Sequence, residues 1–153
     1  MSIIKNEIPI LEYDPNPTAV IMPNHEQISI KLPTKAVFAF LRDDVDRYAI
    51  ERNAVIAAYF ISATKEYPVY ILEVKGQQLC LVQAPVGAPA ATQILDWLIS
   101  YGVQEIISGG SCGVLADIPE NIFLVPCKAL RAIPHNAARA DSVKIWVLMM
   151  ALF

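Results

Sequence analysis

The amino-acid sequence predicts an α/β protein whose mixed, partly parallel sheet is flanked by helices. Residues 36–41 form a continuous apolar run, which is typical of a strand buried on both faces. Residues 79–108 have the pattern of a strand, a helix and a second strand, and such a crossover joins parallel strands in a right-handed sense. Residues 67–74 and 78–82 predict two more strands, and Lys75-Gly76-Gln77 between them predicts a hairpin.

The composition indicates one folded domain. A chain of 153 residues is long enough for a core of its own, and its 55% hydrophobic content with 18% charged residues excludes a disordered protein. The net charge of −3 and the lack of a basic run give no sign of a nucleic-acid partner. The longest apolar run, residues 145–153, is too short to span a membrane, and the first residues do not form a secretory signal. We therefore expect a cytoplasmic location and no membrane partner.

Three segments can be distinguished along the single domain, 1–153. Residues 1–35 contain five prolines and no sustained period, so we expect an extended arm. Residues 36–131 are the predicted α/β core, in which Asp43 or Asp44 caps a helix whose loose apolar stripe continues to residue 59. Residues 132–153 are an atypical tail, whose final apolar run does not keep to the single stripe of a helix.

The strand–helix–strand unit is the most regular part of the core. It comprises a strand at 79–82, a turn at 85–89, a helix at 90–99 and a strand at 103–108. Gly102 is expected to end the helix in a left-handed conformation. Residues 121–127 predict one further strand.

Two glycine-bearing segments follow strands at what we expect to be one edge of the sheet. They are Pro85-Val86-Gly87-Ala88-Pro89 and Gly109-Gly110-Ser111-Cys112-Gly113, and both are predicted to be turns. Ligands of open α/β sheets collect outside the carboxyl ends of strands, where glycines let backbone amides approach an anion. A helix beginning near Ala88 adds its positive end. Neither segment is a Walker loop or a dinucleotide fingerprint, and a purely structural role is the alternative.

The second observation on these segments is a resemblance. The chain resembles the purine nucleoside phosphorylase and uridine phosphorylase family over three successive pieces. They are the turn from Pro85 to Pro89, about a dozen helical residues, and the stretch Tyr101-Gly-Val-Gln-Glu-Ile-Ile-Ser-Gly-Gly-Ser-Cys-Gly-Val114. The similarity covers about residues 79–130, with a weaker match at 36–41 and in the hairpin. It implies a phosphorylase-like core and phosphorolysis of the N-glycosidic bond of a purine or pyrimidine nucleoside.

The resemblance also implies roles for particular residues. Gly87 matches the glycine beside sugar and phosphate, and Val86 matches the residue that contacts the ribose. Ser111 matches the hydroxyl residue that hydrogen-bonds phosphate, within a loop shaped by two glycines, and Cys112 lies where the family has a small residue near the base. The implied substrate and phosphate site therefore comprises Val86, Gly87, Gly110, Ser111, Cys112 and Gly113. Inorganic phosphate is implied as a co-substrate, with no other cofactor.

The chain also departs from the family. Ser108 stands where active phosphorylases carry a phosphate-clamping arginine, whose charge a serine cannot replace. The early Gly-Asp-Pro loop of the family has no clean match, and the chain reads Leu41-Arg42-Asp43-Asp44 there; Arg42 either reaches an anion or is simply solvated. After Arg131 the sequence has no glutamate, and Asp141 lies in no matching motif, so the catalytic residues are unknown.

These departures leave three hypotheses for function. The chain is a phosphorylase in incomplete form, a nucleosidase of the same fold that uses water, or a non-catalytic nucleoside-binding or oligomeric module. We expect little or no turnover, a tail that arises from truncation or an altered reading frame, and self-association that covers apolar surface.

Other chemistry has weaker support in the sequence. Cys112 with His25 or His135 could form a thiol–imidazole pair, but nothing in the sequence brings them together. Trp97 and Tyr101 could stack on a base, although their helical spacing favours packing. No cluster of ligand side chains with metal-site spacing is present, so we expect no metal.

Overall fold

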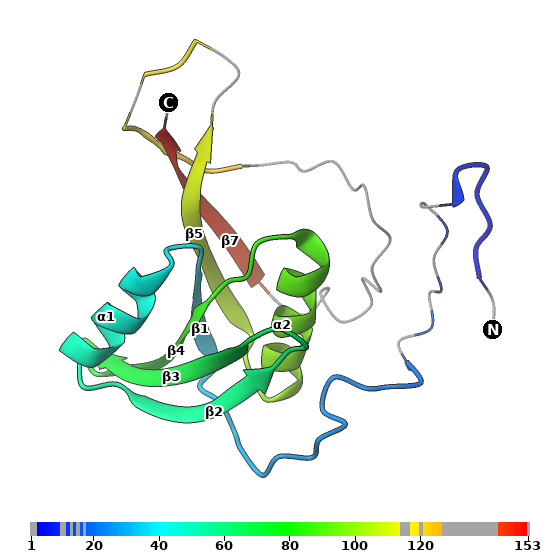
Figure 1. Ribbon diagram of the computed structural model, residues 1–153, viewed down its shortest axis with the longest axis horizontal. Coiled ribbons are helices and arrows are strands. Elements are labelled where there is room, and N and C mark those ends of the chain that lie inside the picture. The colour runs from blue at the N-terminus through cyan, green and yellow to red at the C-terminus, as the bar shows by residue number, and fades with distance from the viewer. Residues whose placement is uncertain are drawn as a thin grey trace.

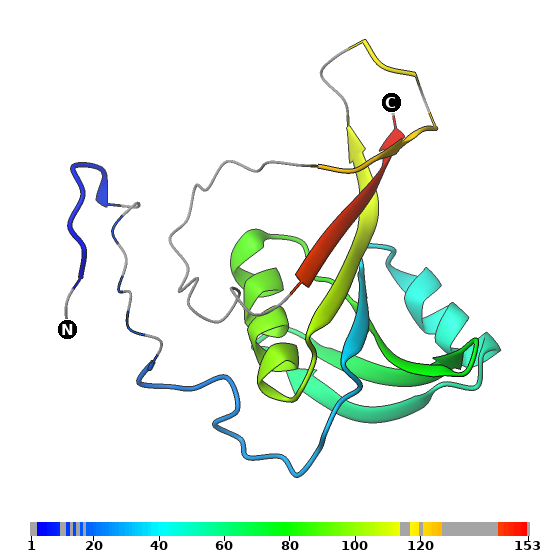
Figure 2. The same ribbon diagram turned by 180° about the vertical axis from the view of Figure 1, so that it is seen from behind.

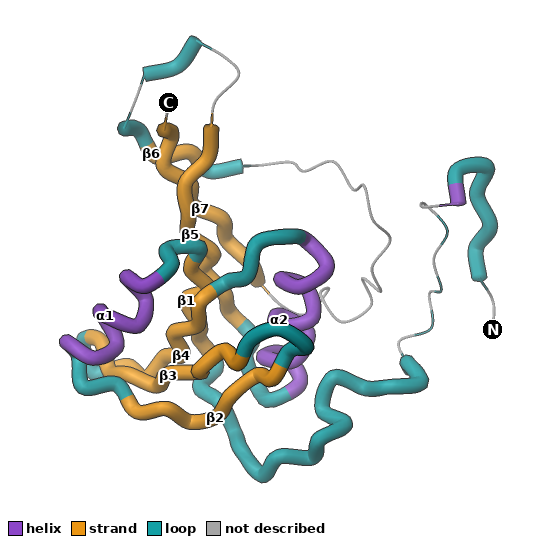
Figure 3. Tube along the Cα trace, in the orientation of Figure 1, coloured by secondary structure: helices purple, strands orange, loops and turns teal. Residues whose placement is uncertain are grey.

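The computed structural model describes residues 3–9, 12, 14, 16, 18–113, 117–119, 121–126 and 144–152. These residues form one seven-stranded sheet with two helices, which confirms the α/β class (Figures 1 and 3). The elements are, in chain order, β1 (Lys35–Ala39), α1 (Asp43–Glu51), β2 (Val55–Ile61), β3 (Glu66–Val74), β4 (Gln77–Gln83), α2 (Ala88–Ser100), β5 (Glu105–Gly113), β6 (Phe123–Leu124) and β7 (Lys144–Leu152).

The strand order in the sheet is β2-β3-β4-β1-β5-β7-β6. β1 pairs in parallel with β4 on one side and β5 on the other, and β7 pairs in parallel with β5. The β2–β3 and β3–β4 pairs are antiparallel, and so is the short β6–β7 pair. The expected mixture of parallel and antiparallel pairing is therefore confirmed. No helix in the described ranges is long and apolar enough to cross a bilayer.

The two helices lie on opposite faces of the sheet (Figure 1). On the α2 face, Ile94 and Leu98 of the helix pack with Phe38 and Ile106 of the sheet, and all four side chains are at most 1% exposed. On the α1 face, a smaller cluster joins the helix to the strands; its buried members are Ala39, Val45, Ala49, Tyr70, Leu72 and Leu81. The α2 face therefore holds the larger core.

The N-terminal arm contributes to that larger core. Residues 18–34 contain turns but no helix or strand, and they run past the end of α2 (Figure 2). Leu32 is only 2% exposed, and its amide donates a hydrogen bond of 2.9 Å to the carbonyl of Tyr101. The Ile28 amide also donates to the Tyr101 hydroxyl at 3.3 Å, and Ile28 and Ile30 pack against the same core, so the arm is held at the end of α2 by several contacts.

The boundaries of α2 follow local chemistry. Gly87 occupies the N-cap with a φ of +104°, and Pro89 lies in the first turn, where a missing amide costs no helical hydrogen bond. Gly102 has a φ of +118°, and its amide donates to the carbonyl of Ile99 at 3.1 Å. The expected glycine cap of this helix is confirmed, and the helix extends one to two residues beyond each predicted end.

The first helix is shorter than its apolar stripe predicted. It ends at Glu51, Asn53 adopts a φ of +52°, and residues 55–61 form β2 instead of a helical continuation. Val55, Ile56 and their neighbours are β-branched, aromatic or small, and they pair antiparallel with β3. Pairing with β3 thus overrides the loose helical periodicity.

Two further predictions about the second half were wrong. The segment Gly109–Gly113 is not a turn, because β5 continues to Gly113 in register with β7. The strand expected at 121–127 is limited to Phe123–Leu124, and Cys127 lies outside the described residues. In the tail, residues 144–152 are a strand and not a helix, and every one of them from Lys144 to Leu152 has a partner in β5.

Candidate functional site

Three parallel strands end at the same edge of the sheet. Ala39 at the end of β1 is in register with Gln83 of β4 and with Gly109 of β5. Beyond this level, the Ala84 amide donates to the Ala39 carbonyl and the Phe40 amide donates to the Gly109 carbonyl, both at 2.8 Å. The carboxyl ends of β4, β1 and β5 therefore form one continuous edge, as the sequence predicted.

The turn after β4 leads directly into α2 at this edge. Val86 is 95% exposed, and Gly87 lies at the N-cap of α2, where a Cβ added to it would meet no atom within 4 Å. No side chain caps the helix start, and the first helical turn contains no acidic residue. The Ala91 amide is already bonded to the Gly87 carbonyl, at 3.0 Å. Because Pro89 has no amide, the first turn offers the amides of Ala88 and Ala90, with the helix dipole, to an anion.

The second predicted segment lies on β5. In Figure 1, β5 and β7 extend together past the end of β1. Ser111 is exposed, Cys112 is half-buried, and Gly113 is exposed with open space around the position of a Cβ. The hydroxyl of Ser111 thus lies on a strand and not in the predicted turn.

Gly110 is confined in a way that Gly113 is not. A Cβ added to Gly110 would lie 3.0 Å from the Cβ of Phe40, which is tighter than nine in ten real Cβ contacts. The absence of a side chain at Gly110 therefore lets Phe40 lie against β5 at the exit of β1.

The structure places all six predicted residues on the same edge, in two groups. Val86 and Gly87 follow β4, whereas Gly110, Ser111, Cys112 and Gly113 belong to β5, and β1 lies between these strands. Two inter-strand spacings, about 10 Å, separate β4 from β5. By the alternation of β5, Gly110 and Cys112 are on the α2 face with Ile106, whereas Ser111 and Gly113 are on the α1 face with Ile107. The edge is therefore open, with the α2 amides starting on one face of the sheet and the serine hydroxyl on the other.

Phe40 is a candidate residue of this edge that the sequence patterns did not indicate. We assigned it to a buried strand, but β1 ends at Ala39 and Phe40 is 38% exposed between the two groups. Its ring meets Phe38 edge-to-face, with centroids 5.8 Å apart and planes at 71°. The polar sequence that starts at Arg42, two residues later, was the available sign that the strand ends early.

Ser108 and Arg42, the two positions that depart from the family pattern, both lie near this edge but differ in burial and in neighbouring charge. Ser108 is half-buried on the α2 face, in register with Phe38 of β1 and Val147 of β7. Arg42 is exposed at the N-cap of α1 with a φ of +50°, next to a first turn that carries three aspartates. The positive charge at this end of α1 is therefore accompanied by a larger negative charge.

The alternative chemical candidates do not gather at this edge. Trp97 and Tyr101 are 2% and 8% exposed with ring centroids 4.6 Å apart, so they are packing residues of the α2 core. His25 lies on the N-terminal arm, with Nδ1 3.0 Å from the Met22 carbonyl. His135 and Asp141 lie outside the described residues.

Two groups with strongly shifted pKa values lie in the sheet interior and not at the edge. Burial, together with the hydrogen bond that the Tyr70 hydroxyl donates to Asp46 at 2.9 Å, raises the pKa of Tyr70 to about 12. Burial raises the pKa of the Cys80 thiol to about 12. Both groups stay protonated at neutral pH, which suits a structural role in the sheet.

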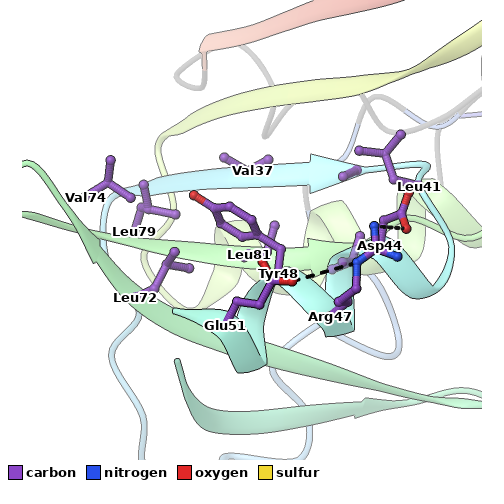
Figure 4. A pocket seen from close by; sticks show the side chains of 12 residues that line it. Val37, Leu41, Asp44, Arg47, Tyr48, Glu51, Leu72, Val74, Leu79 and Leu81 are labelled. Carbon is purple, nitrogen blue, oxygen red and sulfur yellow. Dashed lines mark ion pairs between the residues drawn. The ribbon is translucent and has the colours of Figure 1, made fainter. Parts of the chain in front are cut away.

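A groove of about 490 Å³ lies away from the edge residues, between α1 and the sheet (Figure 4). Leu72, Leu79 and Leu81 are among the apolar residues that line it, and Arg47 forms ion pairs on its rim with Asp44 at 2.7 Å and Glu51 at 4.0 Å. None of the six predicted site residues lines this groove.

Comparison with known proteins adds one finding. The family model described as Phosphorylase superfamily matches residues 39–144, which is more than half of the chain and includes all six predicted site residues. A search of curated proteins gave no significant match.

Proposed function

The chain belongs to the Phosphorylase superfamily, and from this premise we propose that its carboxyl sheet edge binds a nucleoside together with inorganic phosphate. The reaction of this site is phosphorolysis of the N-glycosidic bond of a purine or pyrimidine nucleoside. The chain as it stands performs that reaction slowly or not at all.

One observation carries the proposal. The parallel strands β4, β1 and β5 end together, with an unobstructed Gly87 at the start of α2 and an exposed Ser111 on β5. Free amides, the positive end of a helix and a hydroxyl donor are the groups that bind a phosphate anion. Exposed Val86 and Phe40 supply apolar surface beside them for a sugar or a base.

The proposed chemistry follows from this placement. A phosphate oxygen attacks C1′ of the pentose while the bond between C1′ and the base nitrogen breaks, and the electron pair leaves with the base. The base takes up a proton, and the products are a pentose 1-phosphate and the free base. The amides at the start of α2 donate hydrogen bonds to phosphate and hold it in line for attack. Ser111, whose side chain starts on the α1 face of β5, donates to the same phosphate past the early end of β1.

We assign no proton donor for the leaving base. Among the described residues, the strongly shifted groups, Tyr70 and Cys80, lie in the interior and not at the edge. Positioning without a proton donor accelerates the reaction only partially, because general acid catalysis typically contributes about 10² to 10⁴-fold. Slow turnover is the expected result.

A second candidate function is hydrolysis of the same bond by water. Ser108, where phosphorylases have an arginine, favours it because the site then lacks the bidentate clamp on phosphate. A third candidate, a nucleoside-binding module without turnover, is favoured by the open form of the edge.

Release of free base from inosine or uridine, with and without phosphate, separates these functions. Phosphate-dependent release supports phosphorolysis, release without phosphate supports the nucleosidase, and binding without release supports the module. We expect at most slow, phosphate-dependent release. Rapid turnover by the purified chain would contradict the slow reaction proposed here.

Phosphate binding itself can be tested with a matched pair of serine variants. Ser111→Ala removes a hydroxyl donor at the edge, whereas Ser29→Ala removes an exposed hydroxyl from the arm. A hydrogen bond to a charged group contributes about 1.5–3 kcal/mol, so we expect Ser111→Ala to weaken phosphate binding by about tenfold or more. Titration calorimetry measures this, and equal affinities for both variants would exclude Ser111 from the site.

A further inference from the structure

Phe40 is a large side chain between two very small neighbours at the carboxyl edge of the sheet. One residue beyond the paired ends of β4, β1 and β5, it comes level with Ala84 on one side and Gly110 on the other. All three positions are on the α2 face, because steps of two residues relate them to buried members of the α2 core. Among these three neighbours, Phe40 alone presents more than a methyl group to that face.

The Phe40 ring is held by fixed contacts. The Phe40 amide donates to the Gly109 carbonyl at 2.8 Å, and the ring meets that of Phe38 edge-to-face with centroids 5.8 Å apart. A Cβ on Gly110 would lie 3.6 Å from two ring atoms, Cγ and Cδ2, so the ring lies over the space that this glycine leaves free. Phe40 is still 38% exposed, so an aromatic surface is displayed from a defined position.

This aromatic surface is on the same face of the sheet as the amides proposed to hold phosphate. α2 begins at Ala88, and its partly buried residues Ala91 and Leu95 pack on the core that contains Phe38. Figure 1 shows the start of α2 at the same edge as the end of β1. A nucleoside in line with a phosphate at these amides therefore lies over the end of β1, where Phe40 is displayed.

We propose that the Phe40 ring is the platform on which the nucleobase stacks, and that Gly110 positions this platform. The inference rests on the proposed function, because it concerns the same substrate at the same edge. Of the parts of that substrate, the base alone has a π face, since the pentose carries hydroxyl groups and phosphate is an anion. Aromatic side chains stack on bases of every kind, and a bicyclic base overlaps the ring more than a monocyclic one. The platform therefore favours purine nucleosides.

Ligands with and without a base separate stacking from the other contacts of the site. Inosine carries a purine, uridine carries a pyrimidine, and ribose 1-phosphate carries no base. Phe40→Leu keeps an apolar side chain and removes the π face. Tyr48→Leu is the matched control, because it removes an aromatic ring of similar exposure, 39%, from α1.

Titration calorimetry of these variants gives the expected pattern of affinities. We expect Phe40→Leu to weaken inosine binding about fivefold to tenfold and uridine binding about twofold to fivefold. Ribose 1-phosphate binding should stay within about twofold of the wild type, since it depends on amides and hydroxyl groups. Tyr48→Leu should change none of the three affinities.

Two further variants test the ring and its support separately. Phe40→Tyr keeps an aromatic ring and should restore inosine binding to within about twofold of the wild type. Gly110→Ala forces the ring to move, so we expect weaker inosine binding with ribose 1-phosphate binding retained. Circular dichroism confirms that each variant is folded.

The protons of the base report stacking directly. In the wild type the ring current of Phe40 should move the H2 and H8 signals of bound inosine upfield, and this shift should be lost in Phe40→Leu. A residue that only supports the fold would not remove the shift.

The outcomes distinguish a failure of this inference from a failure of the proposed function. Unchanged inosine binding in Phe40→Leu excludes the platform, and equal weakening of inosine and ribose 1-phosphate shows that Phe40 merely shapes the edge. Both results leave the phosphate site of the proposed function in place. A wild-type chain that binds neither inosine nor ribose 1-phosphate overturns the proposed function itself and the platform with it.

Discussion

The buried Tyr70 and the half-buried Asp46 link two elements through one hydrogen bond. Tyr70 lies on β3 and is 8% exposed, and Asp46 lies on α1. The pKa of Tyr70 is about 12 in the native state, whereas that of an unfolded tyrosine is about 10. The contribution of the neutral hydroxyl to the free energy of unfolding therefore has its full value below pH 10. It is lost as the pH rises from 10 to 12, where the unfolded chain ionises first.

Tyr70→Phe should therefore have a pH-dependent effect on stability. Near pH 8 we expect a loss of about 1 kcal/mol for the missing hydrogen bond. The variant has no hydroxyl to ionise at this position, so its free energy of unfolding should not change for this reason between pH 10 and 12. Over the same range the wild type should lose about 2–3 kcal/mol, since a pKa difference of two units corresponds to that energy. Urea unfolding at several pH values measures the difference. Tyr48→Phe, at an exposed tyrosine, is the control, and a constant difference across pH would contradict the assignment.

Gly110 should tolerate substitution much less well than Gly113. An alanine at position 110 must displace Phe40 or β5, and overpacking of this kind costs about 1–3 kcal/mol. An alanine at position 113 meets open space, so we expect a change below about 0.5 kcal/mol. Urea midpoints of the two variants compare them directly. Similar values would show that Phe40 moves freely.

At the level of elements, the short connections set the ends of α2. Gly102 reverses the chain after the helix with a φ of +118°, and a Cβ there would lie 3.2 Å from the carbonyl oxygen of Leu32. The same glycine thus ends α2 and allows the arm to approach its end.

Gly102→Ala is expected to destabilise the protein by about 1–3 kcal/mol, because the backbone conformation and the close carbonyl both resist a side chain. Gly76→Ala in the β3–β4 hairpin also has a positive φ, +76°, but meets no atom within 4 Å, so we expect about 1–2 kcal/mol. Thermal unfolding of both variants tests the order. A greater loss at Gly76 would contradict the contact with the arm.

At the level of the whole molecule, the two faces of the sheet differ in how completely they are covered. Within the described residues, a helix and the arm cover the α2 face, whereas α1 covers the other face over only part of its width. The difference explains why large apolar side chains of β7 remain exposed.

Matched leucine substitutions measure this asymmetry. Leu98→Ala removes a fully buried side chain from the α2 core and should cost about 2–5 kcal/mol. Leu148→Ala removes a side chain that is 38% exposed, so we expect a loss below about 1.5 kcal/mol. Chemical unfolding at low protein concentration makes the comparison. Equal losses would show that the α1 face is as well packed as the other.

The sequence by itself determined the central part of the fold and the edge where the candidate site lies. The strand at 36–39, the hairpin around Gly76 and the unit from β4 through α2 to β5 follow from local patterns that the structure confirms, whereas Phe40 and Leu41, predicted as part of the first strand, lie beyond its end and are exposed. Glycines and prolines fix turns and helix ends by their own backbone preferences, so no distant partner is needed to predict them. The same segment carries the resemblance that predicted the family.

Tertiary structure alone decided the extent of the strands. β2 had a helical stripe, β5 had glycines typical of a turn, and β7 had an apolar run without period, yet each is a strand because a neighbouring strand accepts its backbone hydrogen bonds. The position of Phe40 at the edge followed from the early end of β1 for the same reason. A helix bonds within its own residues, whereas a strand exists only with a partner distant in sequence, and that partner cannot be deduced from local patterns.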